Sequence, residues 1–168
     1  MNKFIMVAAL VFFLCSCGRT DTMDEKAKPL GIDVSSAEII SKEDDHGGFH
    51  GDGTTFLCLD CSGTDIADQI RNGGNWTPFP LDDTVKALVY GIETRESDSL
   101  IGIGPYLSDE ENRPLIPEIE NGYYLLIDRQ AEEGKATGAD ILHRASFNFT
   151  LGIYDSDADI LYYFELDT

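Results

Sequence analysis

The chain has 168 residues, of which 31 are acidic and 12 are basic, and its formal net charge at pH 7 is −19. A chain this negative repels phosphate backbones, so nucleic-acid binding is not expected. Hydrophobic residues make up 42% of the chain and the acids are spread along it, which is typical of one folded, soluble domain rather than a disordered acidic segment.

The first residues have the pattern of a bacterial export signal. Lys3 supplies a positive charge, and the apolar run from Phe4 to Leu14 is shorter than the roughly 20 residues that span a bilayer as a helix. The run ends in Leu14-Cys15-Ser16-Cys17-Gly18, which resembles a bacterial lipobox. This resemblance implies that a diacylglycerol is attached to the thiol of Cys17 and that residues 1–16 are removed as a signal peptide.

Three parts of the chain are therefore expected. Residues 1–16 form the signal peptide, residues 17–30 form the lipidated cysteine and a polar tether, and residues 31–168 form an extracytoplasmic domain. The lipid would hold the protein at the bacterial cell membrane, on its extracytoplasmic face. The alternative is an ordinary secreted protein in which Cys17 is incidental.

The first two strands are predicted over residues 36–42 and 55–61. Cys58 and Cys61 both fall in the second strand, where positions i and i+3 face opposite sides and lie about 10 Å apart. A disulfide requires Cα atoms within about 7 Å, so no disulfide is expected. We interpret both cysteines as small core residues rather than as a redox pair.

The loop between these strands, over residues 44–53, is rich in carboxylates, imidazoles and glycines. His46 and His50 have the spacing of two metal ligands on one helix face, although the glycines between them disfavour a helix. Together with Asp52, and with His143 from a distant loop, they form a candidate site for a divalent metal or a small ligand. The alternative is a tight hairpin loop in which the glycines serve the turn.

Two short helices are predicted next, over residues 62–74 and 82–91. Each begins at capping acids and ends at glycine, and each carries an apolar stripe. The connector between them, Trp76-Thr77-Pro78-Phe79-Pro80-Leu81, is either a partner-facing groove or a cap over the core. The core is favoured, because large amphipathic aromatics usually pack.

The C-terminal part is predicted as strands. Residues 100–103 and 123–128 are short apolar runs, and residues 147–153 and 160–166 alternate between apolar and polar positions. The acidic turn from Asp155 to Asp159 joins the last two, which predicts a β-hairpin. Calcium loops open with the same D-x-D-x-D pattern, but Ile160 and Leu166 replace the glycine and glutamate that such a loop needs.

These elements predict one α+β domain with an antiparallel sheet of about five strands and two short helices on one face. Four segments, over residues 46–53, 76–81, 121–129 and 147–168, resemble a family of small exported proteins of Gram-positive bacteria. The resemblance extends over most of the chain after Cys17 and implies a shared fold. It implies no activity, cofactor or catalytic residue.

The expected role is binding of a protein or small-molecule partner rather than catalysis. No local motif combines a nucleophile with a base or completes a set of metal ligands. The first alternative is a metal-dependent enzyme that uses His46, His50, Asp52 and His143. The second is an immunity or inhibitor protein, because the negative charge suits a cationic target.

Overall fold

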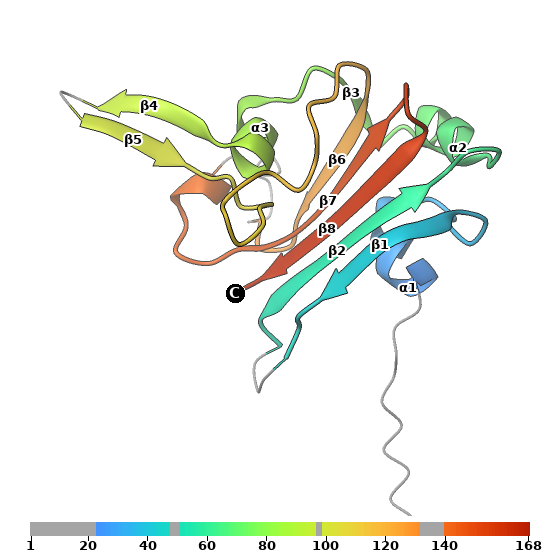
Figure 1. The fold of residues 1–168 in the computed structure, drawn as a ribbon, viewed down its shortest axis with the longest axis horizontal. Coiled ribbons are helices and arrows are strands. Elements are labelled where there is room, and N and C mark those ends of the chain that lie inside the picture. The colour runs from blue at the N-terminus through green and yellow to red at the C-terminus, as the bar shows by residue number, and fades with distance from the viewer. Residues whose placement is uncertain (1–22, 48–50, 97–98, 132–139) are drawn as a thin grey trace, which may run out of the picture.

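The computed structural model describes residues 23–47, 51–96, 99–131 and 140–168. They form an α+β domain in which a six-stranded antiparallel sheet is flanked by short helices (Figure 1). The sheet order is β1-β2-β8-β7-β6-β3, and each neighbouring pair of strands is antiparallel. The expected α+β class is therefore confirmed, with one strand more than predicted.

The strands of the main sheet are, in chain order, β1 (Glu38–Asp44), β2 (Gly53–Asp60), β3 (Thr77–Pro78), β6 (Gly122–Asp128), β7 (Asn148–Asp155) and β8 (Ile160–Asp167). A separate two-stranded sheet is made by β4 (Ile92–Glu96) and β5 (Ser99–Ile103). The helical segments are α1 (Met23–Ala27), the 3-10 turn η1 (Lys28–Leu30), α2 (Ile66–Gly73), α3 (Asp83–Tyr90) and the 3-10 turn η2 (Ile141–His143).

Both faces of the sheet are covered. On one, which we call the α3 face, Tyr162 and Phe164 of β8 pack in a core with α3. On the other, the α1/α2 face, Leu161 and Tyr163 pack with α1 and α2. The prediction that the helices share one face is therefore wrong. The reason is visible in β7, where every residue from Phe149 to Tyr154 is buried, so that neither face of this strand is left to solvent.

The predicted tether also needs correction, because its second half belongs to the domain. Residues 23–30 fold as α1 and η1, and Ala27 and Leu30 are completely buried in the core of the α1/α2 face. The carbonyl of Leu30 also accepts a hydrogen bond of 3.2 Å from the indole N–H of Trp76. Two apolar side chains in a charged segment are too few to predict a helix from their spacing. Once the domain has folded, they are enough to hold this short helical segment against the core.

The predicted C-terminal hairpin is confirmed. Strands β7 and β8 pair from Asn148 with Asp167 to Asp155 with Ile160. In the turn, the carboxylate of Asp155 accepts hydrogen bonds from the N–H groups of Asp157 and Ala158. The acidic residues of this segment are thus used by the turn itself.

The two cysteines lie on opposite faces of β2 and its end, as the strand period predicts. Cys58 is in the core of the α3 face and Cys61 is in the core of the α1/α2 face. Both thiols are free in the structure, and burial raises the pKa of Cys61 to about 12. A thiol with so little thiolate at neutral pH is a poor redox nucleophile.

Candidate functional site

The residues predicted to carry function are described only in part. Cys17 and His50 lie outside the described residues, so lipidation of Cys17 stays a prediction. Asp52 is exposed, and its carbonyl accepts a hydrogen bond of 3.4 Å from the N–H of Gly47. His143 is exposed at the end of η2, which Ile141 anchors in the core of the α3 face.

His46 is held between two carboxylates. Its Nδ1 lies 3.0 Å from Oδ1 of Asp44, and its Nε2 lies 3.3 Å from Oδ2 of Asp167 on β8. The hydroxyl of Thr55 is also 3.1 Å from Nδ1. Asp44, Thr55 and Asp167 follow the strand period onto the α1/α2 face, which is why one imidazole reaches all three.

Two cations complete this network. Lys26 of α1 lies 2.8 Å from Oδ2 of Asp44, and this ammonium holds the pKa of the Asp44 carboxyl well below its ordinary value. Arg129 pairs with Glu165 at 2.9 Å and also contacts Asp167. The arrangement joins α1, the loop after β1 and the C-terminal strand, so its evident role is to stabilise that end of the sheet.

The predicted metal site is not assembled by the described residues. His46 and His143 belong to segments packed on opposite faces, and within the described ranges no group of three His, Cys, Asp or Glu side chains is arranged to hold a metal. Because His50 lies outside these ranges, the metal site and the metal-dependent enzyme based on it stay predictions.

A cavity of about 420 Å³ lies on the α3 face, at the end of β1, β2 and β8, and we call it the acidic cavity. Its lining is aromatic and apolar. Two of the lining residues, Phe56 and Phe164, come from neighbouring strands, and two more, Tyr106 and Leu115, come from the loop over residues 106–115. Its acidic side chains are Glu43, Asp45, Asp109 and Glu110, and Thr54 and Ser108 complete it.

The loop that closes the acidic cavity is well fixed. Leu107 is completely buried, its N–H donates to the carbonyl of Leu88, and its carbonyl accepts from Leu115. Between these points Asp109 pairs with Arg113 at 2.7 Å, and the turn N–H of Arg113 lowers the pKa of that carboxyl. The cavity therefore exists before any ligand binds, which reduces the entropic cost of binding.

The charge in the acidic cavity is not neutralised. Asp109 has Arg113, but Asp45 is held only by the N–H and hydroxyl groups of Thr54, which lower its pKa. Among the side chains that the structure describes, Glu43 and Glu110 have no ion-pair partner. A preformed aromatic hollow with unpaired carboxylates is suited to a cation, through charge attraction and contact with ring faces.

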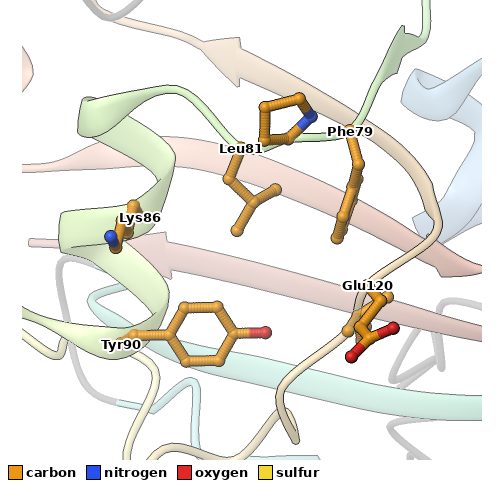
Figure 2. Close-up of a pocket in the computed structure, with 7 residues that line it drawn as sticks. Phe79, Leu81, Lys86, Tyr90 and Glu120 are labelled. Carbon is orange, nitrogen blue, oxygen red and sulfur yellow. The ribbon is translucent and has the colours of Figure 1, made fainter.

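A second hollow, of about 210 Å³, lies between α3 and the connector over residues 76–81 (Figure 2). Phe79 and Leu81 of the connector and Tyr90 of α3 enclose it, with Lys86 and Glu120 at its rim, and the hydroxyl of Tyr90 donates to the carbonyl of Pro117. The rim carries one charge of each sign, so this hollow does not select a ligand by charge.

The core interpretation of the connector is confirmed for Trp76, which is only 8% exposed and packs in the core of the α1/α2 face. Phe79, three residues later, lines the hollow of Figure 2, and a partner at this hollow stays a prediction. No local pattern predicts the acidic cavity, because its residues come from four separate segments of the chain.

No family model, curated protein or solved structure matches this chain. In the part of the chain that the structure describes, no helix has the length and apolar character needed to cross a bilayer.

Proposed function

We propose that the protein is a lipid-anchored, extracytoplasmic binding protein that captures a basic side chain of a partner protein in the acidic cavity. The observation that supports this proposal is the combination of an aromatic lining with the unpaired carboxylates of Glu43 and Glu110 in one preformed cavity. A partner of this kind makes the protein an inhibitor or immunity protein for a cationic target, rather than an enzyme.

The chemistry of the cavity favours a guanidinium or an ammonium group. Phe56 and Phe164 are 8% and 3% exposed and form the apolar floor of the cavity, whereas Tyr106 is half-buried and offers its ring to a cation, and cation–π attraction is stronger where water is partly excluded. The carboxylates around it would supply the hydrogen-bond acceptors that a desolvated cation needs. The net charge of the whole chain would in addition speed the encounter with a basic partner.

Binding can be tested by isothermal titration calorimetry of the full chain with tetra-arginine, with tetraglutamate as the reference peptide. We expect tetra-arginine to bind, and the double variant Glu43→Gln/Glu110→Gln to bind about tenfold more weakly. The matched control is Glu93→Gln/Glu118→Gln, which removes the same charge at exposed positions outside the cavity.

Two results would contradict the proposal. One is that tetra-arginine does not bind, and the other is that both double variants lose affinity equally, since that would assign binding to the overall field. The affinity for free arginine amide, measured in the same way, distinguishes a small amine ligand from a basic side chain of a partner protein. If arginine amide binds as tightly as the peptide, the ligand is a small amine and not a partner protein.

The lipid anchor is tested independently. We expect the mature protein to fractionate with membranes, and mass spectrometry of its first tryptic peptide to show a diacylglycerol on Cys17. Cys17→Ser should release the protein from the membrane fraction, whereas Cys15→Ser should not. An unmodified N-terminal peptide would contradict the lipid anchor and support the alternative of an ordinary secreted protein.

A further inference from the structure

The outer edge of β1 is an open edge of the main sheet over the full length of the strand. β1 is the first strand in the order of the main sheet, and at the other end the two-residue β3 partly covers β6 (Figure 1). In the described residues no strand pairs with the outer side of β1. Such an edge presents free N–H and C=O groups to another strand.

This edge carries the two large apolar side chains that are most exposed. Ile39 is 51% exposed and Ile40 is 56% exposed, and they are the exposed large hydrophobic residues among those described. The register with β2 shifts between Ile39 and Ser41, so Ile40 is the extra residue of a bulge. The charged residues of β1 and its bulge are features that protect an edge from pairing with an arbitrary strand, so a strand that pairs here must be complementary to them.

The sequence of β1 is complementary to itself. In an antiparallel pair of two β1 strands centred on Ile40, Glu38 of each copy lies opposite Lys42 of the other, and Ile39 lies opposite Ser41. The two Ile40 side chains then meet at the centre. Opposite charges and apolar side chains placed directly across an antiparallel pair both stabilise it.

We propose that β1 is a self-pairing edge through which two copies of this chain join their sheets antiparallel, with Ile40 on the two-fold axis. The pairing would bury the exposed isoleucines and satisfy the open edge, and it would form an isologous contact of the kind that closes a dimer. It does not depend on the acidic cavity or on its ligand.

The test is cross-linking of the full chain through Ile40→Cys. Directly opposed residues of an antiparallel pair have Cα atoms about 4.5–5.5 Å apart, which is within the range of a disulfide. We therefore expect rapid covalent dimers from Ile40→Cys under mild oxidation. All chains carry Cys15→Ser and Cys17→Ser, so that the buried Cys58 and Cys61 are the remaining native cysteines. Few dimers are expected from Glu118→Cys, a matched control at another exposed position, or from this parent chain.

Charge reversal makes the test specific for the register. Lys42→Glu in the Ile40→Cys background places like charges opposite each other twice per dimer, and should slow cross-linking about tenfold. Adding Glu38→Lys should restore the rate, because the pairs are then exchanged and not lost. Lys86→Glu, which is exposed on α3, gives the same charge change away from the edge.

The proposal is overturned if Ile40→Cys and Glu118→Cys cross-link at the same rate, because contact would then be random collision. It is also overturned if Lys42→Glu and Lys86→Glu have equal effects, or if Glu38→Lys does not restore the rate. All of these positions are exposed, so loss of the fold is not the expected cause of any change.

Discussion

Gly152, in the central strand β7, is the residue on which Trp76 rests. A methyl group at this position would lie 2.6 Å from Cη2 of Trp76 and 3.0 Å from both Cδ atoms of Leu30. We expect Gly152→Ala to lower the free energy of unfolding by about 1–3 kcal/mol, because neither neighbour has room to move within a packed core.

Urea denaturation measures this change, and Gly73→Ala is its control. A methyl group on Gly73, in the last turn of α2, meets no atom within 4 Å, so this variant should be neutral or slightly stabilising. If the two variants were equally stable, the Trp76 contact would not constrain the strand.

The pair of Arg144 and Asp128 is the most buried ion pair that the structure describes. The side chain of Asp128 is completely buried and that of Arg144 is 16% exposed, and the two carboxylates of Asp128 and Asp140 raise the pKa of the guanidinium. Arg144→Ala would remove the guanidinium that contacts both oxygens of this buried carboxylate, so we expect a loss of about 3 kcal/mol in unfolding free energy.

The comparison for Arg144→Ala is Arg71→Ala, which removes an exposed pair with Asp68. That variant should cost less than about 1 kcal/mol, because exposed pairs are screened by water. If both variants lost the same unfolding free energy in urea denaturation, burial would not explain the contribution of the Arg144 pair to stability.

At the scale of the elements, helices α2 and α3 differ in how their first turns are capped. The carboxylate of Asp82 caps α3 by accepting the N–H of Val85 at 2.8 Å, and it also accepts the hydroxyl of Tyr124. The carboxylate of Asp65, at the start of α2, caps no backbone group and accepts the side-chain amide of Gln69.

This difference predicts unequal effects of the same substitution. Asp82→Ala should cost about 1–2 kcal/mol of unfolding free energy, since it loses both the helix cap and an acceptor of the Tyr124 hydroxyl. Asp65→Ala should cost less than about 0.5 kcal/mol, because it loses one exposed side-chain contact. Thermal denaturation followed by circular dichroism ranks the two, and the reverse order would contradict the assigned caps.

Local pattern predicted most of the elements. The alternation in residues 147–153 and 160–166 predicts β7 and β8, and the acids and glycine that flank α3 predict its bounds within one residue. The end of α2 is predicted equally well, but this helix begins at Ile66, four residues after its predicted start at Ser62. In α2, Gly74 ends the helix in the left-handed conformation, with φ of 73°. These signals were reliable because each depends only on neighbouring residues.

Elements that depend on distant partners could not be predicted. α1 is helical because Ala27 and Leu30 find a core made by α2 and Trp76, and β3 has only two residues, paired with β6. The acidic cavity likewise exists only after the loop over residues 106–115 crosses the strand ends. Of the predicted site residues, His46 has described side-chain partners, and these are two carboxylates and the Thr55 hydroxyl rather than other predicted ligands.

For the whole molecule, buried tyrosines limit the stability of the fold at high pH. Burial raises the pKa of Tyr162 to about 12, and burial followed by nearby carboxylates raises the pKa values of Tyr154 and Tyr163 further. Because these folded-state pKa values exceed the unfolded value of about 10, their contribution to stability is complete below pH 10. It is lost as the pH rises through about 12.

We therefore expect stability to fall steeply above pH 10. Absorbance at 295 nm should show Tyr154, Tyr162 and Tyr163 ionising only as the chain unfolds, and circular dichroism at the same pH values reports the unfolding. Ionisation of all tyrosines near pH 10 with the fold intact would contradict the prediction.

Because the sheet is covered on both sides, its two cores are coupled during unfolding. Neighbouring residues of β7 and β8 pack alternately into two separate cores, so neither core can loosen without disturbing strands that the other needs. The domain should then unfold as one cooperative unit, although its apolar side chains form two clusters. The amide protons shared by β7 and β8 should be the last to exchange with deuterium, at a rate set by global unfolding.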